Sequence, residues 1–321
     1  MIQLNNVTKK YPGDVIAVDN VSLEIEKGET IVFVGTSGCG KTTTLKLINR
    51  LIDLTSGSIT IEGKDISEVD SYALRRTIGF VIQNVGLFPH FTIERNVGVV
   101  PELIGWDKEK TRERTGELLT MVGLEPEVFA DRFPGELSGG QQQRVGVARA
   151  LAANPDVILM DEPFGALDPI TRETLQDELS PLWNDLEKTV VFVTHDIFEA
   201  VKIGDRIAAM DSGKILQVGK PSEVIKNPKD ETVASFFAQH RFQLELLTTR
   251  IEPIIEAYDE NRVKDIKDKI TLHPNDSLID AMDALKSSKD NIVPVFDTQK
   301  KYLGIVNRAS VTKEISNLIE Q

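Results

Sequence analysis

The residues from Gly35 to Thr42 read Gly-Thr-Ser-Gly-Cys-Gly-Lys-Thr, which is the spacing of a phosphate-binding P-loop. Glycines allow the backbone to approach an anion closely, and free amides at the positive N-terminus of a following helix can hold phosphate oxygens. Lys41 would reach the β- and γ-phosphates of a nucleotide, and the Thr42 hydroxyl would bind Mg²⁺. A turn that is merely rich in glycine is the alternative, but the complete pattern favours a nucleotide site. The residues expected to contact the nucleotide here are Gly35, Ser37, Gly38, Cys39, Gly40, Lys41, Thr42 and Thr43.

Two neighbouring carboxylates follow the apolar run from Val157 to Met160. Such a run is typical of a strand buried on both faces of a parallel sheet, and α/β sheets bind ligands at the carboxyl ends of their strands. Asp161 can hold Mg²⁺ through water, and Glu162 can orient and polarise an attacking water. Solvated charges at a strand end are the alternative, which the P-loop in the same chain disfavours.

Three further groups are candidates for contact with a nucleotide. His195 follows the apolar run 190–193 and could contact the γ-phosphate or its water network, although a lone histidine is more often structural. Ser138 is a natural helix N-cap, and the two glycines after it expose free amides that make a second possible anion site. Tyr11 lies in a polar turn, where its ring could stack on adenine or could be an ordinary turn tyrosine.

The elements that must position these residues alternate between strands and helices, which predicts an α/β fold. We expect a helix over 43–48, directly after the P-loop, and a helical insertion from about Val85 to Pro155. The expected strands lie over 2–4, 21–25, 30–34, 57–61, 78–82, 157–160 and 190–193.

Composition limits the classes of function. The 321 residues allow about two domains. The net charge of -13, from 50 acidic and 37 basic residues, disfavours sequence-independent binding to nucleic acid. The single cysteine excludes a disulfide framework within the chain and suits a reducing cytoplasm. The chain has neither an apolar run of ~18–20 residues nor a signal-peptide layout at Met1, so we expect any membrane role to come through a partner. His90, His240 and His273 do not stand at metal-ligand spacing, so no zinc site is expected.

Together these motifs resemble the ATPase subunit of an ABC transporter over roughly residues 1–237. The resemblance implies a P-loop NTPase fold with a RecA-like core, an antiparallel β subdomain and a helical subdomain. It also assigns Lys41, Glu162 and His195 to catalysis, and Thr42, Gln83 and Asp161 to Mg²⁺. The family motifs are the adenine-stacking Tyr11, Walker A at Gly35–Thr42, the Q-loop Gln83, the signature Leu137-Ser138-Gly139-Gly140-Gln141, Walker B at Val157–Glu162, the D-loop Ala166-Leu167-Asp168 and the switch His195.

The resemblance further implies an assembly. Two subunits would pack head to tail, so that Walker A of one and the signature motif of the other enclose the same ATP. One chain supplies one cassette, so a homodimer is expected at the cytoplasmic face of the membrane. Its partners would be permease subunits and a substrate-binding protein or domain, and not nucleic acid. Motion would pass through the helical insertion, with the segment 87–92 bordering the groove for the permease.

The rest of the chain predicts a helical, charged linker over 238–264 and a small α/β lobe over 265–321 that is similar to a single CBS motif. Because such motifs work in pairs, the second is expected from another subunit. A Ser-x-x-acid pattern at Ser277 opens a helix with Leu278, Ala281, Met282 and Leu285 on one face. The other expected elements are strands over 269–272, 291–296 and 302–306 and a last helix with Val311, Ile315 and Leu318.

ABC subunits with this layout resemble the ATPases of importers for glycine betaine, carnitine and choline, in which the tail senses ionic strength or a cyclic dinucleotide. Asn307 and Ser310 stand where many adenosine-binding CBS motifs have Ser or Thr and then Asp, which argues against AMP or ATP in the tail. A lobe that only dimerises is the alternative.

Three other functions remain in view. The ATPase could serve another substrate, such as ergothioneine or another amine or amino acid. A soluble ABC ATPase acting on ribosomes or DNA is disfavoured by the single compact cassette and the acidic balance. A regulatory subunit that senses through its tail is disfavoured by the intact Glu162 and His195.

Overall fold

The computed structural model describes residues 1–83, 86–165, 167–185, 187–259, 270–288 and 290–320, with the side chains of 179–185 left aside. The chain divides into two compact units, Met1–Lys220 and Pro221–Gln321. We call these the N-terminal and the C-terminal unit and describe each by itself.

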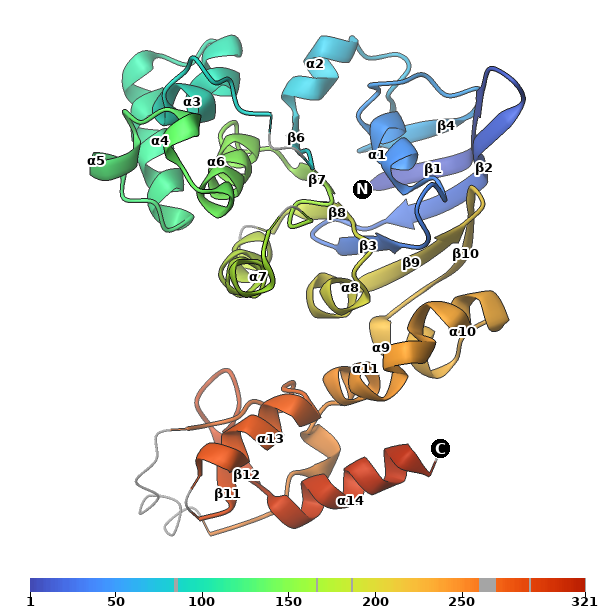
Figure 1. The fold of residues 1–321 in the computed structure, drawn as a ribbon, viewed down its shortest axis with the longest axis vertical. Helices are drawn as coiled ribbons and strands as arrows, with labels where there is room; N and C mark the ends of the chain where they lie inside the picture. Colours follow the sequence, from blue (N-terminus) through green and yellow to red (C-terminus); the bar gives the residue numbers. More distant parts are fainter. Residues whose placement is uncertain (84–85, 166, 186, 260–269, 289, 321) are drawn as a thin grey trace. The chain divides into compact units, whose positions relative to one another are not determined.

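A six-stranded sheet in the order β10-β9-β3-β8-β7-β6 forms the centre of the N-terminal unit (Figure 1). Its neighbours from β9 to β6 pair in parallel, and β10 is antiparallel to β9. Every residue of β3, β7 and β8 is buried, as their apolar runs predict for strands covered on both faces. The strands are β3 (Thr30–Val34), β6 (Ile78–Val81), β7 (Val157–Asp161), β8 (Thr189–Val193), β9 (Arg206–Asp211) and β10 (Lys214–Gly219).

A four-stranded antiparallel sheet in the order β2-β1-β4-β5 forms a second layer. It consists of β1 (Ile2–Tyr11), β2 (Val15–Ile25), β4 (Ser56–Ile61) and β5 (Lys64–Asp65). β1 and β2 are longer than the sequence predicts, because their pairing continues through bulges up to the turn at 12–14. One hydrophobic cluster joins both sheets and helix α1 (Lys41–Ile48), with Leu4, Phe33 and Leu45 among its members. The antiparallel subdomain is thereby confirmed.

The helical insertion is also confirmed. It lies between β6 and β7 and forms a separate group of helices in Figure 1. Its helices are α3 (Ile93–Leu103), α4 (Lys108–Met121), α5 (Pro126–Phe129) and α6 (Gly139–Leu151), with a 3-10 turn at Pro134–Glu136. The remaining helices of this unit are α2 (Ser71–Arg76), α7 (Pro169–Asp185) and α8 (Ile197–Ile203).

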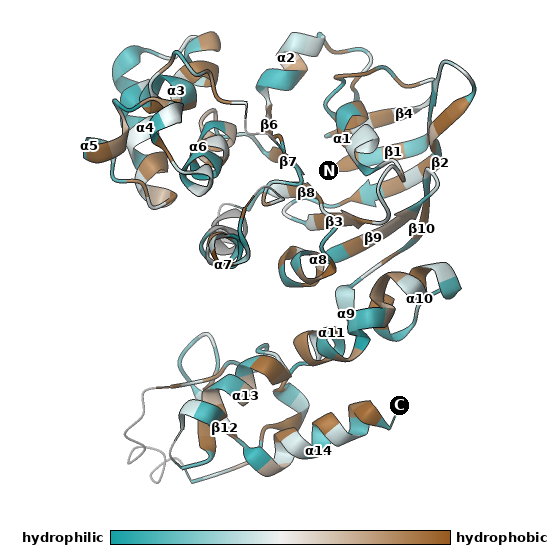
Figure 2. Ribbon diagram, in the orientation of Figure 1, coloured by the Kyte–Doolittle hydropathy of each residue, from teal (hydrophilic) through white to brown (hydrophobic). Residues whose placement is uncertain are grey.

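The C-terminal unit packs a two-stranded antiparallel sheet against helices. Its core includes Leu246, Ile251, Leu278, Val293 and Val306. In Figure 2 the strand β12 carries brown, apolar residues. The elements are α9 (Pro221–Lys226), α10 (Glu231–Phe237), a 3-10 turn at Ala238–His240, α11 (Arg241–Thr248), a 3-10 turn at Glu252–Ile254, α13 (Leu278–Ser287), β11 (Ile292–Phe296), β12 (Tyr302–Asn307) and α14 (Arg308–Ile319).

Three expectations for this unit need correction. The linker expected to be helical over 238–264 has its last described α-helical residue at Thr248, followed by a 3-10 turn at Glu252–Ile254, and residues 260–264 lie outside the described part. Of the strand expected over 269–272, Lys269 lies outside the described residues and Leu272 forms an isolated parallel bridge with Val295. Met282 is exposed and Ala284 is buried instead. At about 100° per residue, Met282 lies beyond Leu278 at the edge of the apolar stripe.

Among the described residues, no helix is both long and apolar enough to cross a membrane.

Candidate functional site

The P-loop follows β3 and curls tightly before α1. Gly35 has φ +152°, and a Cβ there would lie 2.0 Å from the backbone oxygen of Met210. Gly40 has φ +110°, and a Cβ there would lie 2.4 Å from the backbone oxygen of Ala17. Only glycine fits these two places, so the motif is needed for the path of the backbone as well as for ligand access.

Lys41 lies inside this curl rather than extending into solvent. It is buried, and its Nζ donates to the backbone oxygens of Gly35 at 2.7 Å and Thr36 at 3.0 Å. Cys39 Sγ is 3.7 Å from the same ammonium and is buried too. Ser37 and Gly38 are exposed at the tip of the loop, and Thr43 is half-buried in the first turn of α1. The ammonium is thus held where a phosphate on the loop would meet it.

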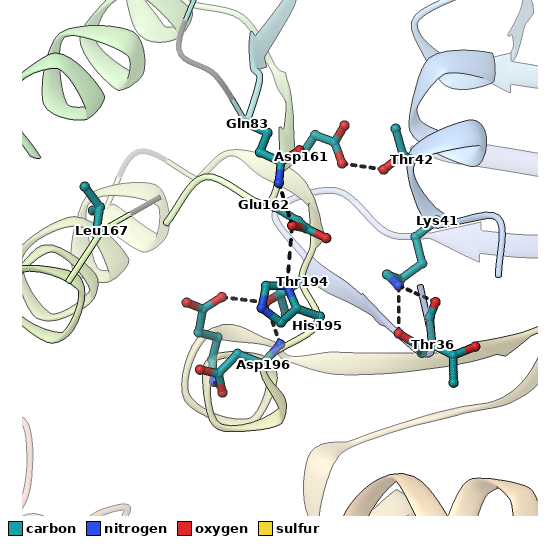
Figure 3. A network of polar contacts seen from close by, with 12 residues as sticks. Thr36, Lys41, Thr42, Gln83, Asp161, Glu162, Leu167, Thr194, His195 and Asp196 are labelled. Atoms are coloured by element: carbon teal, nitrogen blue, oxygen red, sulfur yellow. Dashed lines mark hydrogen bonds and ion pairs between the residues drawn. The ribbon is translucent and has the colours of Figure 1, made fainter. Parts of the chain in front are cut away.

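Thr42 and Asp161 come together although they are far apart in the sequence. Thr42 Oγ1 donates to Asp161 Oδ1 at 2.7 Å (Figure 3). Burial raises the pKa of the Asp161 carboxyl, and so does the neighbouring Glu162, while the hydrogen bond from Thr42 opposes the shift. A buried carboxylate beside a hydroxyl supplies the oxygen ligands that Mg²⁺ prefers, so these residues fit that ion.

Glu162 is the meeting point of the other expected residues. Gln83 Nε2 donates to Glu162 Oε2 at 2.9 Å, and His195 Nδ1 lies 3.4 Å from the same oxygen. Figure 3 shows the three side chains converging from different segments of the sheet edge. The Glu162 backbone has φ +46°, in the left-handed region, and its N–H donates to Val193 O at 2.9 Å. Such a conformation costs a non-glycine residue about 1–3 kcal/mol and persists only where the surroundings enforce it.

The parallel sheet explains why these groups meet. β3, β6, β7 and β8 are neighbours in one parallel array, and their carboxyl ends share one edge. The P-loop, Gln83 and His195 follow β3, β6 and β8, and the Asp161–Glu162 pair stands at the end of β7, so the topology gathers these groups at that edge.

The signature segment opens α6 as the sequence predicts. Ser138 is the N-cap: its Oγ accepts from Gln141 N at 3.3 Å, and Gln141 Oε1 accepts from Ser138 N at 2.9 Å. A Cβ on Gly140 would lie 2.7 Å from Thr171 Cγ2, so glycine lets α6 approach α7 closely. Gly139 has no such close neighbour among the described residues. These bonds stay within the segment, which leaves its outer amides to another group.

Tyr11 and Asp168, which were also expected to contact the nucleotide, are not part of the group around Glu162. Tyr11 ends β1 with an exposed ring, and Lys9 Nζ is 5.2 Å from the ring centroid. Asp168 is exposed and accepts from Thr171 N at 3.1 Å. Hydrogen bonds from the Thr171 hydroxyl and then from its amide lower the pKa of the Asp168 carboxyl. Ala166, the first residue of the expected D-loop, lies outside the described residues.

A second polar network, not predicted from the sequence, lies beside His195. Buried Glu199 accepts from Thr194 Oγ1 at 2.6 Å and from Gln176 Nε2 at 2.9 Å. Arg172 lies 3.4 Å from Asp196 Oδ2. Burial raises the pKa of the Glu199 carboxyl, against the hydrogen bond from Thr194 and the charge of Arg172. An Asp three residues before a Glu at a helix start is a capping signal, but it does not reveal the arginine.

A P-loop, a Walker-type carboxylate pair and a converging Gln and His on a parallel sheet define a nucleotide-hydrolysing ATPase of the ABC class. The family profile for ABC transporters matches residues 18–165, and that for CBS domains matches residues 263–317. The glycine betaine/carnitine/choline transport ATP-binding protein OpuCA of Bacillus subtilis is 48% identical over 96% of this chain and 78% of its own length.

Two further comparisons point to the same family. The osmoprotectant import ATP-binding protein OsmV of Salmonella typhimurium is 47% identical over 96% of this chain and 79% of its own length. A solved dimeric structure of a bacterial ABC transporter cassette is 42% identical, covers 68% of this chain and 98% of its own, and has a TM-score of 0.63. The chain belongs to the family of ABC-transporter ATP-binding proteins and carries a CBS domain. It is an ABC-type ATPase that works with ATP and Mg²⁺, and members of the family act as dimers with membrane permease components.

Proposed function

We propose that this chain is the ATP-hydrolysing subunit of an importer for a quaternary ammonium compatible solute of the glycine betaine, carnitine and choline type. It acts as a homodimer at the cytoplasmic face of the membrane, beneath permease subunits that receive solute from a substrate-binding protein or domain. The names and the long coverage of the relatives support the substrate class.

The convergence of Gln83 and His195 on Glu162, beside the Thr42–Asp161 pair, carries the proposal of hydrolysis. Glu162 accepts the proton of the attacking water, and Gln83 and His195 hold its carboxylate in place. Lys41 and the loop amides bind the phosphate oxygens, so Lys41 exchanges its present backbone acceptors for phosphate.

Thr42, Gln83 and Asp161 would hold Mg²⁺, which when bound neutralises charge on the phosphates. The cation would lower the pKa of Asp161 against the effect of burial, because it stabilises the charged form of the carboxyl. Thr42 and Asp161 are already hydrogen-bonded to each other, so these two expected Mg²⁺ ligands lie side by side.

A second copy completes the nucleotide site. The Ser138 hydroxyl and the amides of Gly139 and Gly140 of one subunit meet the phosphates bound to the other. Asp168 lies at the same junction, and Tyr11 stacks on the adenine. This is supported by the solved relative, a dimeric ATP-binding cassette bound to ADP and Pi that is 41% identical and has a TM-score of 0.63.

The CBS lobe regulates turnover in response to ionic strength or a cyclic dinucleotide. Asn307 Nδ2 donates to Glu256 Oε2 at 2.8 Å, and Asn307 Oδ1 caps α14 by accepting from Ser310 N at 2.8 Å. Both groups are engaged within the lobe, and Ser310 offers no carboxylate to a ribose, which disfavours AMP or ATP there. A lobe that only pairs with its counterpart would bind none of these ligands.

The Glu162→Gln variant tests the ATPase and the dimer together. Glutamine keeps the shape of the side chain but cannot accept the proton, so steady-state hydrolysis should fall by at least about 100-fold. The ATP-bound dimer should accumulate and be seen by sedimentation velocity in saturating MgATP. The matched control is Glu162→Gln with Lys41→Ala, which should stay monomeric because nucleotide binding is weakened. A strictly monomeric Glu162→Gln chain would contradict the shared site, and normal turnover would contradict the role of Glu162.

The substrate class needs a separate experiment. Proteoliposomes that contain this chain with its permease and binding domain should accumulate labelled glycine betaine, carnitine or choline in the presence of ATP. Transport of ergothioneine or an unrelated amino acid in place of these solutes would leave the ATPase assignment intact and overturn the substrate.

A further inference from the structure

Arg172, in the first turn of α7, contacts groups on two different segments. Its Nη2 donates to the backbone oxygen of Leu167 at 3.2 Å. Its Nη1 lies 3.4 Å from Asp196 Oδ2, and its Nε lies 3.9 Å from Glu199 Oε1. One rigid, permanently charged guanidinium therefore joins the loop at 167–168 to the junction of β8 and α8.

That junction carries His195 between two residues whose positions are fixed. Asp196 N donates to Thr194 Oγ1 at 2.9 Å, and the same hydroxyl donates to Glu199 Oε2 at 2.6 Å. Asp196 Oδ1 accepts from Phe198 N at 2.9 Å and so caps α8. The backbone on both sides of His195 thus belongs to the network that Arg172 holds.

The buried end of the network has little freedom to rearrange. Glu199 is 4% exposed and Gln176 is 6% exposed. A buried carboxylate that loses its partners is strongly unfavourable, so this end keeps one arrangement while its contacts last. By contrast, the side chain of His195 is 60% exposed. Its imidazole is therefore placed by its backbone and by Glu162 rather than by surrounding side chains.

We propose that Arg172 is a positioning residue that couples the conformation of the loop at 167–168 to the placement of His195 opposite Glu162. This inference rests on the proposed role of His195 in hydrolysis. The contacts described for Arg172 are with Leu167, Asp196 and Glu199, so it acts through His195. A second subunit that contacts the exposed Asp168 would thereby act on the histidine of the same chain.

Kinetics provide the first test. In Arg172→Ala, kcat should fall by about tenfold while KM for MgATP changes by less than about twofold, because the lost placement matters for the chemical step. Arg172→Lys should recover part of the rate, since lysine keeps the positive charge but has a single ammonium in place of the planar guanidinium that contacts several groups at once. The control is Lys202→Ala, which removes the ion pair with Asp177 between the same two helices and leaves the junction untouched. A rate for Arg172→Ala equal to that of Lys202→Ala would overturn the inference.

A second test separates positioning from general damage to the fold. In the His195→Ala background, Arg172→Ala should cause no further loss of single-turnover rate, because the group it positions is absent. An equal fold loss in both backgrounds would show that Arg172 acts independently of His195 and would overturn the inference.

Proton NMR gives a readout without turnover. The chain has four histidines, and the His195 imidazole signal is the one missing in His195→Ala. Arg172→Ala and Arg172→Lys should both shift this signal, and Lys202→Ala should leave it in place. An unchanged signal in both Arg172 variants would count against the coupling. Full hydrolysis by His195→Ala would instead remove the proposed role of His195, and the two failures are therefore distinguishable.

Discussion

At the scale of residues, the site is an assembly of side chains that come from distant parts of the chain. Each motif carries its own chemistry, so Lys41, Thr42 and the carboxylate pair could be named from spacing alone. The Thr42–Asp161 bond spans 119 residues and depends on the strand order. The Arg172–Glu199 network could not be predicted, because arginine and glutamate on helices are usually solvated charges, and only packing brings these two together.

Cys39 offers a direct test of the P-loop at this scale. Its thiol is buried beside the Lys41 ammonium. Alkylation by a maleimide should therefore require the loop to open, and saturating MgATP should slow it by at least about tenfold because bound phosphates hold the loop closed. The rate is measured by mass spectrometry of the intact chain.

The control for this experiment is Cys39→Ser, which has no thiol and should take up no label. Equal alkylation of the wild-type chain with and without MgATP would show that nucleotide does not occupy this loop.

At the scale of elements, apolar runs identify β3, β7 and β8 correctly, because a strand that is covered on both faces is apolar along its whole length. The buried strand β9 was not predicted from the sequence. The ends of the β1–β2 hairpin were not predicted, and the strand predicted over 269–272 is only an isolated bridge at Leu272. Both differences have one reason: pairing with a distant partner, rather than local preference, decides where a strand begins and ends.

Gly304 in β12 shows how tightly one element can depend on a single residue. It has φ +146°, and a Cβ there would lie 2.4 Å from the backbone oxygen of Glu256. The same oxygen accepts from Ile305 N at 2.9 Å. Gly304→Ala should therefore destabilise the C-terminal unit by about 1–3 kcal/mol. The reason is that neither the backbone at Gly304 nor that at Glu256 can move away without breaking the hydrogen bond between Ile305 N and Glu256 O. The measurement is thermal unfolding followed by calorimetry.

Gly116→Ala is the comparison, since its Cβ would meet no atom within 4 Å in α4. Alanine should add about 0.5–1 kcal/mol to the stability of that helix. Basal ATPase activity should persist in both variants at low temperature. A Gly304→Ala chain that melts like the wild type would show that this pairing is absent in solution.

At the scale of the whole molecule, the order of motifs predicts an ATPase region and a CBS lobe, and the family comparisons confirm both. The sequence could not show how the lobe uses the segment before it. α11 packs against α13 and α14, and Leu246 belongs to the same core as Leu278. A cut at residue 265 would leave that apolar surface uncovered, so a truncation is better placed before Arg241.

Truncation before Arg241 should keep basal ATPase activity within about twofold, since solved cassettes span only 68% of this chain. Its hydrolysis should no longer respond to salt or to cyclic di-AMP when assayed with the permease in liposomes. The full-length chain in the same liposomes is the control. A truncated chain that responds as the full chain does would place the sensor outside the lobe.

The left-handed backbone at Glu162 has a cost that the fold carries permanently. Both Glu162→Gly and Glu162→Gln remove the charge next to Asp161, but only glycine relieves the backbone, by about 1 kcal/mol. The inactive glycine chain should therefore resist heat better than the inactive glutamine chain. At Glu162 the protein therefore has lower thermal stability in exchange for catalytic activity. Selection for heat tolerance alone would favour replacement of this residue first.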